Sequence, residues 1–386
     1  MNSKSSSFVV VLRGPAAVYF EREEYLRITD FPGPAGALTL VLQTRYLDLG
    51  LGTDFPGQMW VEVRGPADGL DSALGFANAA LDVVPLLSFG VNAGIGIPKV
   101  ELAFENTSGK EKREFFQQFV PEERTPGVSR KVRVEPIGAL IQQVMQHPEF
   151  ERLYRAITQY SLALLNWDGG KGILATAHLY MGVEALTPVV RRRLCRERGA
   201  ENEQLATALG VTIQELDPTI RKELIFQGDN DCYQDAKAAS DGFEHGFRSF
   251  PDIRTLGEPV RKKTADYLRT AILKELLLEP TTINELTRPS YDQPLGSWQI
   301  ERKLRGHLLG GTDDLSADGQ VYPIMHWKSK VKSVTRTEAG EYKVSFDEKL
   351  TASLGPGISF RPASYEIWGP TGFKRKEPPE TDLEED

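Results

Sequence analysis

The fold is decided by Ile173-Leu-Ala-Thr-Ala-His178-Leu-Tyr-Met-Gly-Val-Glu184-Ala-Leu186, together with Ser240-Asp-Gly-Phe-Glu-His245-Gly-Phe247 further along the chain. In both stretches, titratable side chains interrupt apolar residues that recur at helical spacing. The same spacing continues through the surrounding region, as in Leu153, Ile157, Tyr160 and Leu164. Residues 136–286 are therefore predicted to form an all-helical bundle.

The region before the bundle has the pattern of strands. Short runs rich in β-branched, aliphatic and aromatic residues occur at 8–13, 37–43 and 59–64, separated by Pro-Gly turns. An apolar stripe from 70 to 87 predicts one helix. Residues 1–135 are therefore predicted to form a β-rich module.

After the bundle the hydrophobic period returns to two. Strands are predicted at 298–309, 322–335, 341–346 and 358–368, with a hairpin turn at Glu338-Ala-Gly-Glu341. This predicts a small β module at 297–373, followed by an acidic tail at 374–386 that is too polar to bury a core and is expected to be disordered. The whole chain is accordingly predicted to be an α+β protein of three parts.

Composition limits the function. The chain of 386 residues has 46 basic and 54 acidic side chains, for a net charge of −8. Proteins that coat duplex DNA usually carry a basic surface, so no duplex DNA is expected as a partner. The longest apolar stretch carries Asp71, Asn78, Asp82 and Pro85, which argues against a membrane span.

The small number of cysteines and the polar N-terminus bear on the cellular compartment and on metal cofactors. Cys195 and Cys232 have no histidines at ligand spacing nearby, so two unpaired thiols and no metal site are predicted. The polar N-terminus does not have the pattern of a signal peptide. We expect a cytoplasmic protein with no metal ion and no organic cofactor.

One group of residues has the types needed for catalysis. If the helix continues through Gly242 and Gly246, then Asp241, His245 and Arg248 lie on one stripe. The carboxylate would orient the imidazole, and the arginine would stabilise an oxyanion or a phosphate. A histidine in an amphipathic helix also commonly has a purely structural role, and this holds for His178 too.

Glu184 is the other titratable residue of interest. It shares a helix face with Ile173, Ala177 and Tyr180, so we expect it to lie toward the core. A carboxylate there needs a partner, which His245, Arg191 or Arg248 could supply. Such a pair could equally serve only to fix the register of two helices.

These two stretches are similar to the HEPN superfamily, and within it to the Apea-like branch of prokaryotic defence proteins. The likeness rests on the Glu184-Ala-Leu turn and on the His245-Gly pair that ends a helix. It implies an RNA-processing or antiviral protein that cleaves RNA without metal, with His245 as general acid or base, Asp241 and Glu184 as orienting groups and Arg248 as a phosphate partner. The arginine that the family carries four to six residues before this histidine is absent, and Ala239, Ser240 and Asp241 stand there.

Two basic groups could contact RNA. The first is the arginine run at one helix end, and the second is the lysine run near His326; they comprise Arg191, Arg192, Arg193, Lys328, Lys330 and Lys332. The arginines could equally offset the helix dipole, and the lysines could protect an edge strand. A literal Arg302-x4-His307 also occurs, but in a strand-like segment outside the bundle, where we interpret it as coincidence.

Two functions remain open at this stage. The chain is either a HEPN-like RNA endonuclease or a non-catalytic binding protein that dimerises or docks a partner through its helical bundle. RNA, a protein partner or a second copy of the chain are the partners that these functions imply.

Overall fold

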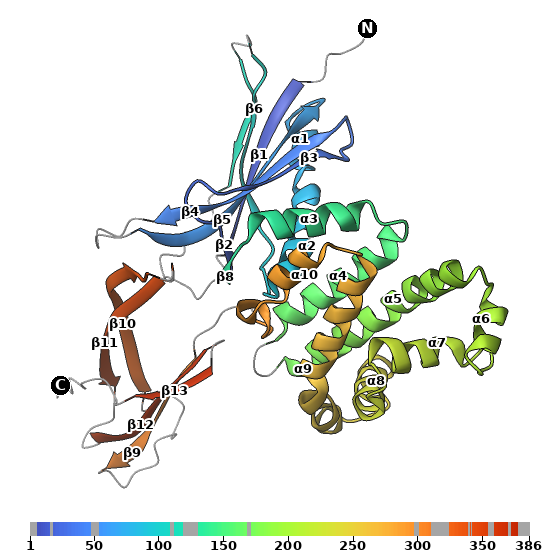
Figure 1. Ribbon diagram of the computed structural model, residues 1–386. Helices are drawn as coiled ribbons and strands as arrows, with labels where there is room; N and C mark the ends of the chain where they lie inside the picture. Colours follow the sequence, from blue (N-terminus) through green and yellow to red (C-terminus); the bar gives the residue numbers. More distant parts are fainter. Residues whose placement is uncertain are drawn as a thin grey trace. The chain divides into compact units, whose positions relative to one another are not determined.

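The computed structural model describes the chain in two units. It describes all residues except 1–5, 16–17, 48–53, 109–111, 119–129, 168–170, 297–300, 310–323, 339, 341, 354–358, 370–371 and 377–386. The first unit comprises Met1–Arg45, Gly57–Glu123 and Gly127–Ser297, and the second comprises Tyr46–Pro56, Arg124–Pro126 and Trp298–Asp386. The fold is α+β, as the sequence predicts (Figure 1).

A six-stranded sheet of order β3-β4-β5-β1-β6-β7 opens the chain. Its strands are β1 (Ser6–Pro15), β3 (Leu26–Phe31), β4 (Leu38–Leu47), β5 (Phe55–Ala67), β6 (Lys99–Glu105) and β7 (Phe115–Gln117). β1 pairs antiparallel with both β5 and β6, and its residues 8–12 are all buried. This confirms the strand predicted at 8–13. A second, two-stranded sheet joins β2 (Val18–Tyr19) to β8 (Arg130–Lys131).

The helix predicted at 70–87 is two helices. α1 (Leu70–Leu74) ends at Gly75, and α2 (Ala77–Val91) starts after Phe76. The Gly75 N–H donates to Ser72 O at 3.2 Å, which closes a turn between them. α2 then ends at Asn92, which has a left-handed φ of 53°.

The remaining helices form the predicted bundle. They are α3 (Val134–Met145), α4 (Phe150–Leu165), α5 (Gly172–Arg198), α6 (Asn202–Ala208), α7 (Leu216–Thr219), the π-helix η1 (Ile220–Ile225), α8 (Asn230–His245), α9 (Phe250–Glu275), α10 (Pro280–Leu286) and the 3-10 helix η2 (Pro289–Tyr291). The long α5 packs against α4, α8 and α9. Asp229, the first residue of the Asp229-Asn230-Asp231 cluster, caps α8 by accepting from the Cys232 N–H.

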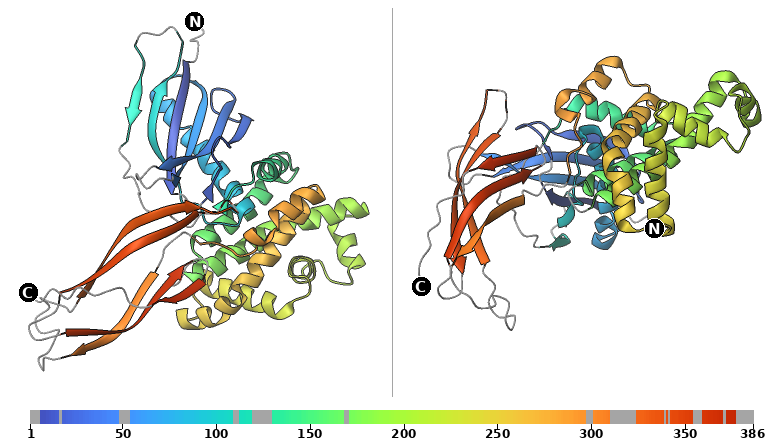
Figure 2. Two further views of the ribbon diagram at one scale, coloured as in Figure 1. Left: turned by 60° about the vertical axis from the view of Figure 1, so that its left-hand side comes forward. Right: turned by 90° about the horizontal axis from the view of Figure 1, so that it is seen from below.

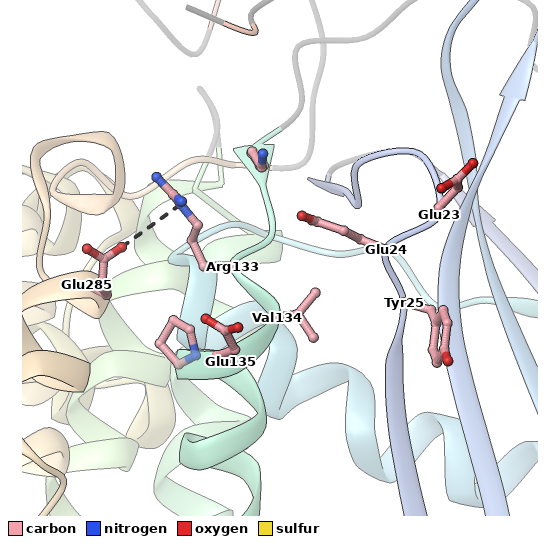
Figure 3. A pocket seen from close by; sticks show the side chains of 9 residues that line it. Glu23, Glu24, Tyr25, Arg133, Val134, Glu135 and Glu285 are labelled. Atoms are coloured by element: carbon pink, nitrogen blue, oxygen red, sulfur yellow. Dashed lines mark ion pairs between the residues drawn. The ribbon is translucent and has the colours of Figure 1, made fainter.

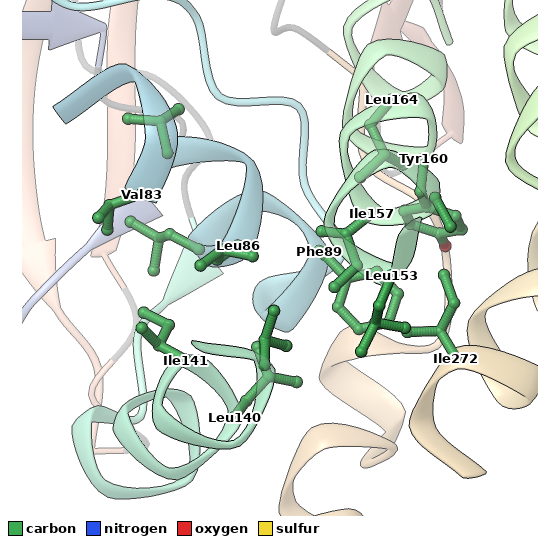
Figure 4. Packing of buried hydrophobic residues seen from close by; sticks show 14 of the residues in the cluster. Val83, Leu86, Phe89, Leu140, Ile141, Leu153, Ile157, Tyr160, Leu164 and Ile272 are labelled. Atoms are coloured by element: carbon green, nitrogen blue, oxygen red, sulfur yellow. The ribbon is translucent and has the colours of Figure 1, made fainter. Parts of the chain in front are cut away.

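One hydrophobic core connects the sheet to the bundle. Side chains of α2, α3, α4 and α9 meet in it, as Figure 4 shows for Val83, Leu86, Phe89, Leu140, Ile141, Leu153, Ile157, Tyr160, Leu164 and Ile272. The predicted modules 1–135 and 136–286 thus share a core and lie in the same unit. Two helical stretches, Leu70–Val91 and Gly172–Arg198, are long and apolar enough to cross a membrane by length and composition, but 61% and 67% of their most apolar 18-residue windows are buried inside the protein.

The second unit consists of strands. β10 (Ile324–Arg336) and β11 (Tyr342–Ser353) form a long hairpin, and β9 (Glu301–Leu309), β12 (Ser359–Gly369) and β13 (Gly372–Lys376) form a sheet of order β13-β12-β9 (Figure 2). The four predicted strands are confirmed and β13 is an addition. Phe55 and Val334 are the buried centre of a small cluster there. The tail predicted to be disordered at 374–386 was placed too early, because residues 374–376 belong to β13; from 377 onward it lies outside the described residues.

Candidate docking site at the α8–α9 turn

The segment between α8 and α9 is a tight, capped turn. α8 ends at His245 because Gly246 takes a left-handed φ of 68°. Ser249 then caps α9 by accepting from the Asp252 N–H at 3.3 Å, and Pro251 occupies the first turn of that helix. The continuous helix through Gly246 that would align Asp241, His245 and Arg248 is therefore not formed.

Arg248 nevertheless lies close to α8. After the reversal at Gly246 its side chain packs over Gly242, where a Cβ would lie only 3.0 Å from Arg248 Cδ. Asp241 forms an ion pair with Lys237 one turn earlier in α8, rather than orienting His245. The His245 ring is exposed, with the Phe247 ring at a centroid distance of 5.5 Å.

Glu184 does not join this group. It is exposed rather than drawn toward the core, and its carboxylate pairs with Arg221 Nη1 at 3.0 Å instead of with His245, Arg191 or Arg248. Nearby, Tyr180 of α5 lies beside Tyr233 at the start of α8, with ring centroids 6.4 Å apart. Because α8 rises about 1.5 Å per residue, His245 lies on the order of 18 Å further along it. One copy of the chain thus does not assemble the predicted catalytic residues.

The turn exposes two phenylalanines. Phe247 is 79% exposed and Phe250 is 65% exposed, which makes them the most exposed aromatic side chains of the described chain. Phe247 lies in the turn between the two helices, and Phe250 is the first residue of α9. We call Phe247, Phe250, His245 and Arg248 the α8–α9 tip.

Charges around the α8–α9 tip are balanced. Arg248 and Arg254 are nearby cations, Glu244 and Asp252 are nearby carboxylates, and Arg254 Nε lies 3.9 Å from Glu258 Oε1 of the same helix. The Glu244 carboxylate accepts from Ser240 Oγ at 2.6 Å, and Asp252 accepts from Ser249 Oγ at 2.6 Å. An apolar centre with a mixed, charged rim is typical of a protein–protein interface.

The arginine run at the end of α5 is paired with carboxylates. Arg191 contacts Asp217 at 2.7 Å, Arg192 contacts Glu149 at 2.5 Å, and Arg193 contacts Glu275 at 2.9 Å. These pairs connect α5 to neighbouring helices, and they offset the positive charge that phosphate binding would need. The structure therefore favours the structural interpretation of these arginines.

The lysine run lies on β10. Lys330 and Lys332 are exposed; Lys330 stands opposite Asp347 of β11, and Lys332 falls at a register shift between Val331 and Ser333. Lys328 pairs with position 349 through the backbone, and its side chain lies outside the described residues. Their contact with RNA stays a prediction.

His178 has a structural environment. It is half-buried on α5, and its Nδ1 lies 2.8 Å from Gln159 Oε1 of α4. Burial lowers the pKa of His178, which favours the neutral ring. This matches the structural role that its sequence context also allows.

A shallow pocket of about 610 Å³ lies elsewhere in the first unit. One wall carries Glu23, Glu24 and Tyr25, and the other carries Glu135, Arg133 and Glu285 (Figure 3). Arg133 pairs with Glu285 at 3.9 Å, and the remaining cation, Lys131, pairs with Glu21 at 3.0 Å. Since carboxylates outnumber cations, the pocket does not suit phosphate, and its residues come from distant segments without a sequence motif.

Comparison with protein families, with curated proteins and with solved structures gives no match to this chain. The geometry described above therefore carries the functional argument. The sequence singled out His245 and Arg248 as catalytic candidates, which stays a prediction, and it did not single out Phe247 and Phe250. The sequence does place these two phenylalanines in a turn between helices, because Gly246 is a residue that commonly ends a helix and Ser249-Phe-Pro251 is a pattern that commonly begins one.

Proposed function

We propose that this chain is a binding protein that self-associates through the α8–α9 tip of its helical bundle. The observation that carries the proposal is the pair of phenylalanines, 79% and 65% exposed, on a turn fixed by a cap at each side. Burying a phenylalanine side chain is worth roughly 2 kcal/mol, so their exposure in one copy is unfavourable. Aromatic and arginine side chains also dominate the energetics of protein interfaces.

The charges around the tip favour a second copy of the chain as the partner. A two-fold interface brings each surface against itself, so it must be self-complementary. Arg248 and Arg254 on one copy can face Glu244 and Asp252 on the other, while the phenylalanines meet at the centre. A strongly acidic or strongly basic partner would find no matching charge there.

Sedimentation equilibrium tests this proposal. We expect the wild type to be a dimer, and Phe247→Ser/Phe250→Ser to be a monomer with an unchanged circular dichroism spectrum. Phe115→Ser is the matched control, because Phe115 is 63% exposed on β7, away from the tip, and should leave the dimer intact. A wild type that stays monomeric at its highest soluble concentration would exclude self-association.

Metal-independent RNA cleavage at His245 is a second candidate function. It is favoured by the exposed imidazole beside the Phe247 ring, on which an unpaired base could stack. Self-association through the tip would also bring two copies of His245 together. The resemblance to the HEPN superfamily supports the same chemistry, in which His245 acts as general acid or base.

A cleavage assay on mixed cellular RNA in EDTA separates the two candidates. Cleavage by the wild type that is lost in His245→Ala, at equal thermal stability, would support the enzyme. If neither folded protein cleaves RNA, the binding function stands without catalysis. Sedimentation equilibrium measures the dimer in the absence of RNA. Its result therefore does not depend on whether the protein cleaves RNA, and the two proposals are tested separately.

A further inference from the structure

The turn between α3 and α4 is held by a histidine side chain. Residues 146–149 join the two helices, and the Phe150 N–H donates to His147 O at 3.0 Å, which closes the turn. Inside this turn, the Glu149 N–H donates to His147 Nδ1 at 3.1 Å. The bond runs from a side chain to the backbone two residues on, as asparagine and aspartate side chains commonly do in turns.

This hydrogen bond requires a neutral imidazole. A backbone N–H is always a donor, so Nδ1 must accept with its lone pair, and the ring proton of the neutral His147 lies on Nε2. Protonation adds an N–H at Nδ1, and two donors then face each other. The bond to the Glu149 N–H therefore exists only while His147 is neutral.

The surroundings of the His147 ring favour its neutral form. The ring is half-buried, and burial lowers its pKa most, followed by the positive charge of Arg196 on α5. The Glu149 carboxylate and a hydrogen bond to the Glu275 backbone on α9 raise the pKa, but by less. The Glu275 carboxylate itself is bound by Arg193, 2.9 Å away.

The turn is connected to α5 through Glu149. The side chain of Glu149 is 11% exposed, and its carboxylate lies 2.5 Å from Arg192 Nη1 and 3.7 Å from Arg196 Nη1. The Glu149 carbonyl also begins α4, since it accepts from the N–H groups of Arg152 and Leu153 at 3.1 and 3.0 Å. A displacement of Glu149 would thus loosen both the first turn of α4 and its contact with α5.

His178 shows why a buried histidine is not by itself such a device. It is half-buried on α5 and its pKa is also lowered by burial. Its Nδ1, however, lies 2.8 Å from Gln159 Oε1, which is an acceptor. A ring N–H can donate to that oxygen in both protonation states, so protonation of His178 breaks no hydrogen bond.

We propose that His147 is a pH-sensitive switch, which keeps the α3–α4 turn closed when neutral and opens it when protonated. A proton taken from solvent at Nδ1 breaks the bond to the Glu149 N–H and places a second positive charge beside Arg196. The new imidazolium also attracts the Glu149 carboxylate, in competition with the arginines of α5. The rest of α4 stays packed, because Ile157 and Tyr160 are fully buried. The proposal does not rest on self-association or on cleavage at His245.

Native-state hydrogen exchange at about pH 7.5 and about pH 5, corrected for the intrinsic exchange rate, tests this proposal. In the wild type, protection of the amides of Phe150, Arg152 and Leu153 should fall by roughly threefold or more at the lower pH. Amides of residues 157–164, later in the same helix, should change less. The difference within one helix distinguishes local opening of the turn from a loss of global stability.

Two substitutions of His147 make the test specific. His147→Asn supplies an Oδ1 that accepts from the Glu149 N–H at both pH values, so the first turn of α4 should keep its protection at about pH 5. His147→Ala has no acceptor and should show reduced protection at both pH values.

His178→Gln is the matched control, because it removes the other half-buried histidine whose pKa is lowered by burial. It should leave the pH dependence of the first turn of α4 as in the wild type. The proposal is overturned if His147→Asn keeps the wild-type pH dependence in that turn, or if all of α4 loses protection to the same extent.

Discussion

At the scale of single residues, Gly242 inside α8 and Gly246 at its C-terminal cap have different conformational requirements. A glycine inside a helix is less favourable than alanine by up to about 1 kcal/mol, whereas a left-handed residue favours glycine by a similar amount. Gly242 lies inside α8, and a Cβ there would lie 3.0 Å from Arg248 Cδ, 3.2 Å from Arg248 Cβ and 3.3 Å from Arg248 Cγ, so the start of the arginine side chain leaves little room for it. Gly246 has a φ of 68° and an open surrounding.

We therefore predict that Gly246→Ala destabilises the protein by about 1 kcal/mol, and that Gly242→Ala changes stability by less than about 1 kcal/mol, because the close contact with Arg248 offsets the gain in helix propensity. Urea unfolding followed by circular dichroism measures both changes. A loss of stability in Gly242→Ala would mean that the contact of Arg248 with this glycine outweighs helix propensity.

His178 should make stability depend on pH. Burial lowers its pKa in the folded protein, so the unfolded chain takes up a proton at higher pH than the folded one. Its contribution is complete above the ordinary histidine pKa of about 6.5 and declines as the pH falls below that value. His147 acts in the same direction, since burial and then the charge of Arg196 lower its pKa.

We expect the free energy of unfolding to fall between about pH 7.5 and about pH 5.5, and to fall less in His178→Gln. Chemical unfolding at the two pH values measures this. An equal pH dependence in the wild type and the variant would assign the whole effect to other groups.

At the scale of elements, a buried ion pair joins the C-terminal ends of α5 and α9. Arg193 Nε lies 2.9 and 3.0 Å from the two oxygens of Glu275, whose side chain is 3% exposed. Burial raises the pKa of Glu275 and the arginine opposes that rise. Removal of one partner leaves the other charge without compensation in a poorly solvated place.

We predict that Arg193→Met destabilises the protein by about 3 kcal/mol, whereas Arg193→Met/Glu275→Leu stays within about 1 kcal/mol of wild type. The surface pair of Lys262 with Asp266, exposed by 47% and 44%, is the control. Lys262→Met should change stability by less than about 0.5 kcal/mol. If the double variant is as unstable as the single one, the pair is stabilising in its own right.

The sequence predicted which segments form helices and which form strands. It predicted less well where those elements end and which polar side chains contact each other. The spacing of hydrophobic residues along the sequence identified β1, α5 and the four strands β9 to β12, because the side chains that an element buries recur with the period of that element. It did not show that α8 stops at Gly246, since a glycine is compatible with both a helix interior and a helix end. Nor could it pair Glu184 with Arg221, because that contact depends on the position of η1 against α5.

At the scale of the whole chain, the end of α2 connects the sheet to the bundle. Asn92 Oδ1 accepts from Tyr160 Oη at 2.7 Å, and its Nδ2 donates to Tyr291 O at 2.7 Å. The buried Arg269 donates to Gly90 O at 2.9 Å, and Arg130 donates to Val91 O at 3.0 Å. Burial, and then the charge of Arg269, lower the pKa of Arg130 to about 10.

These contacts join the end of α2 to four other segments that are distant in sequence, so no local pattern could reveal them. Their consequence is that the sheet and the bundle should unfold together. Phe89 of α2 is the residue to change, because it is fully buried, packs edge-on against Tyr160 at 5.3 Å and lies under Arg269 at 5.2 Å.

Phe89→Ala should lower the stability of the first unit by about 3 kcal/mol, the usual effect of such a truncation in a core. In native-state hydrogen exchange we expect amides of β1 and β5 to lose protection together with those of α4, because they share one core with Phe89. Amides of the β10–β11 hairpin should be unaffected. Val334→Ala, at a side chain 2% exposed in β10, should give the reverse pattern. If Phe89→Ala weakens protection in α4 but leaves β1 and β5 unchanged, the sheet and the bundle are separate cooperative units despite their common core.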